Sequence, residues 1–194
     1  CKHYWICSKI QSLSYDEQIK EKSSQVEDAF VRLGGFLNFK LDRVQKANLI
    51  YHYRNKMEFT FSPNRWVLES EPEGVDKSFA LGLHIPGRFD KILDIHNCHI
   101  QPEIGNKILA VAREVCLANP ELRPYDPRSH IGFLRFLMLR FGVNTGDLMV
   151  NVVTSYHDID KLSPLTDLLL EKFPEITSLV NNAVSYTHLT LPTS

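Results

Sequence analysis

The sequence predicts an α+β domain with a mainly antiparallel sheet, two packed helices and a further helix near the N-terminus. Short stretches of alternating apolar residues, separated by turn residues, indicate hairpin-connected strands. Two later segments repeat apolar residues at helical intervals instead. The chain has 194 residues, which is sufficient to bury one core.

The N-terminal helix is expected within residues 14–35. Ser14 and Glu17 have the spacing of a capping box, in which hydroxyl and carboxylate satisfy two backbone N–H groups. Gly34-Gly35 then ends a narrow apolar stripe formed by Ile19, Val26, Phe30 and Leu33. Because the opposite side is strongly charged, we expect a surface helix that packs on a domain outside this chain.

The remaining elements are expected in one α+β domain, residues 36–183. Alternation and turn signals predict strands at 44–50, 53–61, 65–69, 79–85, 91–95, 132–141, 148–155 and 176–183. The turn at 62–64 predicts a hairpin between the second and third of these. Helices are expected after Pro102 and from a Ser163-Pro164 cap to Pro174.

Five arginines and lysines are candidate anion contacts. In strand 53–61, Arg54 and Lys56 share the face opposite Met57. They either decorate a solvated surface, with Lys56 paired to a neighbouring glutamate, or contact phosphate. The other three are Arg88 in a loop, and Arg135 and Arg140 in an apolar strand, where each guanidinium needs an acidic partner or an anion.

The four cysteines are too few for a disulfide scaffold and indicate metal ligands in a reduced compartment. Cys1, Cys7 and Cys98 lie in loops or at a strand end, where thiolates hold iron–sulfur clusters or zinc. Cys116 lies on a helix and is expected to be a small buried apolar residue. His3, His96 and His99 keep zinc open as an alternative.

Composition excludes some classes of partner. The formal net charge of −1 provides no global field for nucleic acid, so any anion site must be local. No apolar run approaches the roughly 20 residues that span a bilayer, so no membrane partner is expected. Without a secretory signal, we expect a cytoplasmic location, or an organelle if the source is eukaryotic. The protein is expected to be a monomer.

The chain is expected to be a fragment. It starts at Cys1 rather than at methionine, and residues 184–194 resemble the translated end of a sequencing adapter. An ordinary C-terminal strand is the alternative for this tail.

Six short segments, in this order, resemble one family: CKHYWIC (1–7), SYDEQ (14–18), YRNK (53–56), LGLH (81–84), DIHNC (94–98) and GFLR (132–135). The chain resembles the S-adenosylmethionine-dependent RNA (uracil-5-)-methyltransferases, which act on ribosomal or transfer RNA. The resemblance covers residues 1–182. It implies that Cys1, Cys7 and Cys98 ligate a [4Fe-4S] cluster, as part of a cluster loop at residues 1–13, and that Arg54 and Lys56 face RNA.

The resemblance also implies what this chain lacks. The catalytic cysteine, its base and the S-adenosylmethionine site of the family lie in a Rossmann-like methyltransferase domain that we expect to be absent here, leaving the fragment inactive alone. The fourth cluster cysteine is missing, and Ile10 stands near its place. Two alternatives stay open: a non-catalytic RNA-binding or zinc-stabilised α+β module, and a purely structural domain.

Overall fold

A computed structural model describes residues 10–184. The chain divides into two compact units, Cys1–Tyr51 and His52–Ser194. The predicted ligands Cys1 and Cys7, together with His3 and the tail from residue 185 onward, lie outside the described residues.

The first unit contains the predicted N-terminal helix. Helix α2 spans Tyr15–Asp28 and continues as a π-helical turn, Ala29–Leu33, which ends at Gly34. The capping box is confirmed, since the Glu17 carboxylate accepts the Ser14 N–H at 2.8 Å and the Ser14 hydroxyl accepts the Glu17 N–H at 3.3 Å. The strand predicted at 44–50 is wrong, because this segment forms no ladder and the Ala47 N–H donates to the Tyr15 hydroxyl at 2.8 Å.

The second unit is built on one seven-stranded sheet in the order β2-β4-β3-β1-β5-β6-β7. The pairs β1–β3, β1–β5, β3–β4 and β5–β6 are antiparallel, whereas β2–β4 and β6–β7 are parallel, so the sheet is mixed. The strands are β1 Lys56–Ser62, β2 Arg65–Trp66, β3 Ala80–Ile85, β4 Arg88–Asp94, β5 Leu134–Phe141, β6 Leu148–Thr154 and β7 Ser178–Ala183.

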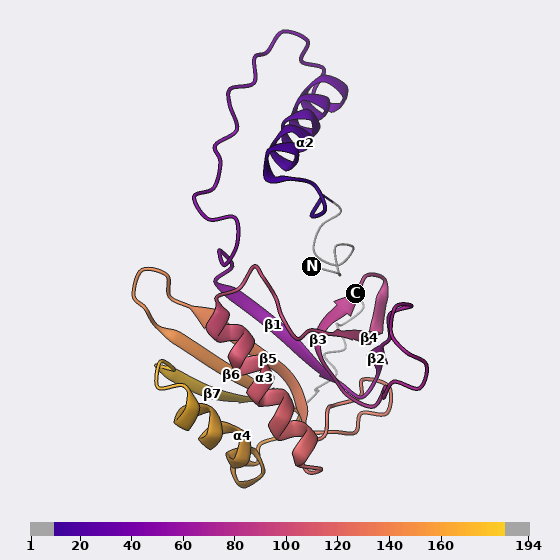
Figure 1. Cartoon of the computed structure of the whole chain (residues 1–194), viewed down its shortest axis with the longest axis vertical. Helices are drawn as coiled ribbons and strands as arrows, with labels where there is room; N and C mark the ends of the chain where they lie inside the picture. The colour runs from indigo at the N-terminus through magenta and orange to yellow at the C-terminus, as the bar shows by residue number, and fades with distance from the viewer. Residues whose placement is uncertain (1–9, 185–194) are drawn as a thin grey trace, which may run out of the picture. The chain divides into compact units, whose positions relative to one another are not determined.

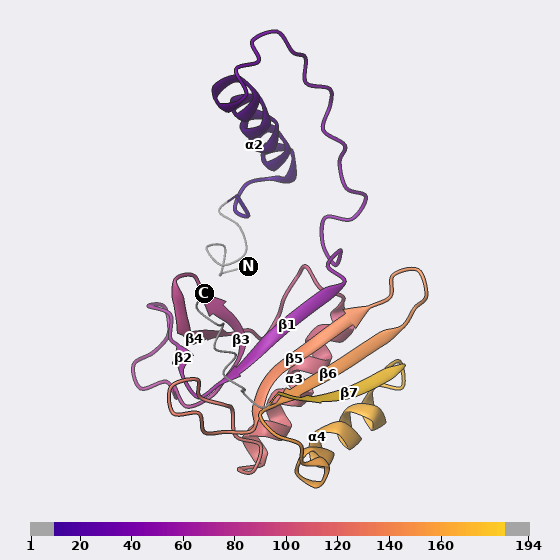
Figure 2. The same ribbon diagram turned by 180° about the vertical axis from the view of Figure 1, so that it is seen from behind.

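Two helices cover one face of this sheet. Helices α3 (Glu103–Ala118) and α4 (Ile159–Lys172) lie in front of the strands in Figure 1 and behind them in Figure 2. The core between helices and strands is apolar, and among its fully buried side chains are Phe59, Phe61, Leu81, Ile108, Leu109, Leu137 and Leu165. No helix among residues 10–184 is long and apolar enough to cross a membrane.

The α+β class is therefore confirmed, with two corrections to strand pairing and length. Strand β1 begins at Lys56 rather than at residue 53, and both Arg54 and Tyr53 precede it. The expected hairpin at residues 62–64 is wrong, because β2 pairs in parallel with β4 through Arg65↔Ile92 and not with β1. A local turn signal does not specify which strand accepts the returning chain.

Helix α4 starts earlier than predicted. Its N-cap is Asp158, whose carboxylate accepts the Lys161 N–H at 3.0 Å, and Pro164 lies inside the helix. A proline in this position lacks the N–H that would bond the Asp160 carbonyl. The Ser163 hydroxyl donates to that carbonyl instead, at 2.9 Å, so Ser163-Pro164 is an internal pair and not a cap.

Candidate functional site

Three of the five predicted cations meet at one end of β1 and β5. Lys56 on β1 is directly opposite Arg140 on β5. The Arg54 Nε donates to the Lys56 carbonyl at 3.0 Å, which brings a third cation beside the pair. All three side chains are exposed. Arg54, Lys56 and Arg140 are named the basic edge cluster.

The electrostatics of the basic edge cluster favour an anion. Like charges on directly opposite strand positions repel each other. The nearest compensation for Lys56 is Glu58, whose carboxylate is 4.0 Å from the Lys56 Nζ, with both side chains about half exposed. Lys56 and Arg140 also line a small hollow of about 280 Å³ together with Asp147. One weak, exposed ion pair relieves only part of the repulsion.

The loop that carries Cys98 lies against the same segment. The His52 N–H donates to the His99 carbonyl at 3.0 Å, and the Arg54 N–H donates to the Ile100 carbonyl at 2.8 Å. These two bonds run along the chain immediately before β1. The structure therefore places the Cys98 loop beside Arg54, although 44 positions separate the two residues in sequence.

A buried asparagine holds Cys98 in position. The Asn106 side-chain oxygen, on α3, accepts the Cys98 N–H at 2.9 Å and the Gln101 side-chain amide at 2.6 Å. The Asn106 amide donates to the side chains of Asn97 at 2.9 Å and Glu103 at 3.1 Å. Because these groups are buried or half-buried, one side chain fixes the loop at both ends.

A second buried network supports the strand that leads into this loop. Arg113 on α3 donates to the Asp94 carboxylate at 2.9 Å and to the Ile95 carbonyl at 2.7 Å. Asp94 also accepts the Leu81 N–H at 2.9 Å. Both charged side chains are less than 10% exposed, and the guanidinium bonds two carbonyls as well as the carboxylate. A buried pair with these additional bonds holds the end of β4 in a defined position.

The described cysteines do not by themselves make a metal site. Cys98 is buried, and the other described free cysteine is Cys116. Burial raises the pKa of the Cys116 thiol to about 12, in keeping with the small buried apolar residue expected on this helix. Within residues 10–184 no three potential ligands stand together; His96 bonds the Asp94 carboxylate at 3.0 Å instead.

The two remaining predicted cations lie away from the basic edge cluster. Arg88, at the start of β4, is exposed, with its Nε 3.4 Å from the Asp90 carboxylate and its guanidinium 6.0 Å from the centre of the Trp66 ring. Arg135 is buried; its guanidinium lies 4.7 Å from the centre of the Tyr125 ring and donates to the Val184 carbonyl at 3.3 Å. Arg135 thus has an aromatic face and a carbonyl as partners.

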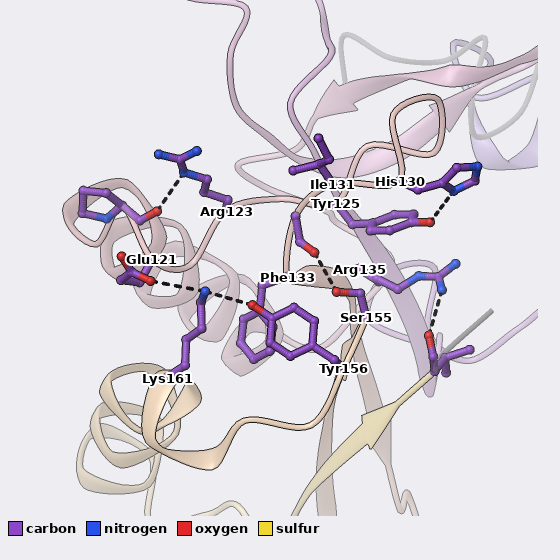
Figure 3. A pocket seen from close by; sticks show the side chains of 13 residues that line it. Glu121, Arg123, Tyr125, His130, Ile131, Phe133, Arg135, Ser155, Tyr156 and Lys161 are labelled. Carbon is purple, nitrogen blue, oxygen red and sulfur yellow. Dashed lines mark hydrogen bonds and ion pairs between the residues drawn. The ribbon is translucent and has the colours of Figure 1, made fainter.

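Arg135 lines a large pocket of about 1100 Å³ that the sequence did not indicate. Figure 3 shows its two sides: Lys161, Tyr156 and Phe133 on one, and Tyr125 with His130 on the other. The expected cap at Ser163-Pro164 leaves Lys161 outside the predicted helix, so the sequence does not place its side chain. The earlier start of α4 at Ile159 places Lys161 in the first helical turn.

Polar bonds fix the side chains of this pocket. The Lys161 Nζ donates to the Tyr156 hydroxyl at 3.0 Å and lies 3.3 Å from the Glu121 carboxylate. The hydrogen bond to Tyr156 raises the pKa of Lys161, burial opposes this, and Glu121 adds to the increase. The Tyr125 hydroxyl is 2.7 Å from the His130 Nδ1.

Comparisons with known proteins identify the relationship. No family model matches the chain. An uncharacterized RNA methyltransferase of Porphyromonas gingivalis is 40% identical over 189 residues, which are 93% of this chain and 40% of that protein. A second, from Chlorobaculum tepidum, is 37% identical over 182 residues, or 91% of this chain and 38% of the relative.

The chain is homologous to a segment of RNA methyltransferases. It spans about 40% of the length of these relatives. The crystal structure of Pyrococcus abyssi tRNA (uracil-54, C5)-methyltransferase in complex with S-adenosyl-L-homocysteine has the same fold over 80% of this chain and 33% of its own, with a TM-score of 0.57 and 22% identity.

Proposed function

We propose that this chain is the RNA-holding central part of a methyltransferase that methylates C5 of a uridine in ribosomal or transfer RNA. In the proposal the central domain is residues 36–183, of which the part from His52 onward belongs to the compact unit that contains the sheet. The helix at 14–35 packs on another domain of the parent protein. The parent acts as a monomer and takes its methyl group from S-adenosylmethionine.

The observation that supports this proposal best is the pairing of Lys56 with Arg140. Two cations held opposite each other on rigid strands are poised for a polyanion, because a phosphate between them turns repulsion into attraction. Arg54 adds a planar guanidinium with donors for phosphate oxygens. Arg88 and Arg135 provide further positive charge along the same RNA.

The chemistry of methyl transfer belongs, in this proposal, to the rest of the parent protein. The chain corresponds to about 40% of its curated relatives, which leaves more than half of each relative for other domains. We assign S-adenosylmethionine and the catalytic residues to a Rossmann-like domain there. The 194-residue chain is then inactive alone, and radioactive methyl transfer to RNA by this chain would contradict the assignment.

Cys98 is the proposed ligand that this domain contributes to a [4Fe-4S] cluster. Its backbone is held by Asn106 and its loop adjoins Arg54, so a cluster at this point would stiffen the RNA-facing segment. When bound, such a cluster supplies a rigid cross-link between distant segments. The remaining ligands, Cys1 and Cys7, lie outside the described residues.

Anaerobic purification of the parent protein, followed by iron, sulfide and zinc analysis, tests the cluster. We expect iron and sulfide in the wild type, their loss in Cys98→Ser, and their retention in the matched control Cys116→Ser. Zinc in place of iron would instead favour a zinc-stabilised, non-catalytic module.

RNA binding tests the central claim. Fluorescence anisotropy with labelled single-stranded RNA should detect binding by the chain, and Lys56→Gln should weaken it. Lys107→Gln is a matched control, since Lys107 is an exposed lysine on α3. The proposal fails if wild type, Lys56→Gln and Lys107→Gln bind RNA equally well, or if the wild-type chain does not bind RNA.

A further inference from the structure

The 1100 Å³ pocket lies at the opposite end of β5 from the basic edge cluster. Arg140 is near the end of β5, and Arg135 is near its start. Five residues of extended strand separate them, or roughly 17 Å at about 3.3 Å per residue. The pocket is therefore a separate site, formed by the loop before β5, the end of β6 and the first turn of α4.

The lining of the pocket combines aromatic rings with an excess of positive charge. Arg123, Arg135 and Lys161 provide three cations, whereas Glu121 is the carboxylate that lines it. Tyr156 is 45% exposed within this lining, although its ring also packs 4.9 Å from the centre of the Phe133 ring. The exposed part of the Tyr156 ring is available to a ligand.

Two hydrogen bonds fix the orientation of Tyr156 and Arg123 beside the pocket. The hydrogen bond from Lys161 to the Tyr156 hydroxyl, at 3.0 Å, orients the tyrosine ring (Figure 3). The Arg123 Nε donates to the Pro120 carbonyl at 3.2 Å, which keeps this exposed guanidinium beside the pocket. A fixed aromatic surface next to a fixed cation loses little side-chain freedom when a ligand binds.

We propose that this pocket binds one unpaired nucleotide of the RNA, with its base against Tyr156 and its phosphate at Arg123. The inference rests on the proposed function and adds a second contact point for the same RNA. Unpaired bases stack on aromatic side chains, and their phosphates require cations nearby. Lys161 is a positioning residue that orients Tyr156, and Arg135 contributes charge from beneath the Tyr125 ring.

The separation of the two sites defines what they recognise together. A single strand that contacts Arg140 and also enters the pocket follows β5 across several nucleotides. A duplex keeps its bases paired and is unable to place one in the pocket without unstacking it. The pocket therefore favours RNA with an unpaired segment beside the backbone held by the basic edge cluster.

The test is ultraviolet cross-linking and affinity measurement with single-stranded RNA that carries 5-bromouridine. We expect cross-links at Tyr156 and a loss of affinity of about tenfold or more in Tyr156→Ala, the usual effect of removing one stacking ring. Tyr156→Phe keeps the ring but loses the hydrogen bond from Lys161 that orients it, so its affinity should lie between those of the wild type and Tyr156→Ala. Phe89→Ala is the matched control, because Phe89 is an exposed aromatic residue on β4.

Thermal melts of each variant establish that it is folded before binding is compared. Wild-type affinity in folded Tyr156→Ala, combined with reduced affinity in Lys56→Gln, would overturn the pocket inference and leave the proposed function standing. Equal losses in Tyr156→Ala and Phe89→Ala would also overturn it, as would preference for duplex over single-stranded RNA. If the wild-type chain binds no RNA, both proposals fail together.

Discussion

The opposition of Lys56 and Arg140 predicts that one substitution changes stability and RNA binding in opposite directions. Arg140→Gln keeps most of the side-chain stem and removes one of the two facing charges. Relief of like-charge repulsion across a strand pair is worth on the order of 0.5 kcal/mol at an exposed position. For a domain of this size, that corresponds to an increase in Tm of about 1–2 °C.

The same substitution should weaken RNA binding in a salt-dependent way. Each phosphate contact to a single strand contributes about 0.7 to the slope of log affinity against log salt. Arg54, Lys56 and Arg140 together then contribute about 2, and Arg140→Gln should lower the slope by about 0.7. When the salt concentration rises from roughly 50 to 200 mM, affinity should fall by about 2.6-fold for each phosphate contact.

Two assays on the same preparations measure both effects. Scanning calorimetry gives Tm, and fluorescence anisotropy with labelled single-stranded RNA at several salt concentrations gives the slope. Arg140→Lys keeps the charge and should leave the slope near that of the wild type, and Lys107→Gln should leave it unchanged. An unchanged slope in Arg140→Gln would refute phosphate contact at Arg140. A lower Tm would refute the inferred repulsion.

The other predictions concern the elements that support the site. Asn106→Leu should cost about 2 kcal/mol or more, because it leaves the buried Cys98 N–H unpaired, and should speed hydrogen exchange of that amide; slow exchange in a folded variant would contradict this role. Gly82→Ala should destabilise by about 2 kcal/mol in urea unfolding, since its Cβ would lie 1.9 Å from the Leu93 carbonyl oxygen; wild-type stability would show that the strands separate freely. Because burial raises the pKa of Cys116 to about 12 from a usual value near 9.0, the unfolded chain loses this proton first, and unfolding free energy should fall from about pH 9 to pH 12. The decline should be smaller in Cys116→Ala, and equal declines would contradict the raised pKa.

Local sequence patterns were sufficient to predict several helices and strands. The Ser14–Glu17 capping box forms as its spacing predicts, because both partners lie within one helical turn. The hairpin between β5 and β6 and the helix after Pro102 also form where turn and periodicity signals predict them. All of these depend on interactions between residues close in sequence.

Hydrogen bonding between segments distant in sequence was not predicted by these local patterns. Strand β2 follows β1 after a turn yet pairs with β4, and the segment at 44–50 has strand-like residues without a partner strand. In both cases hydrogen bonding to a distant segment determines the outcome, and a turn or an alternation does not encode that partner. The start of α4 was missed because Ser163-Pro164 resembles a cap, whereas Asp158 provides the real one.

The sequence by itself determined the α+β class, the types of residue available for anion contact, and the resemblance to RNA methyltransferases. Only the tertiary structure decided which of them meet: Lys56 opposite Arg140, the Cys98 loop beside Arg54, and Lys161 with Tyr156 and Arg135 around one pocket. The physical reason is that residue identity provides charge, rings and hydrogen-bonding groups. Strand register and helix packing set the distances between them.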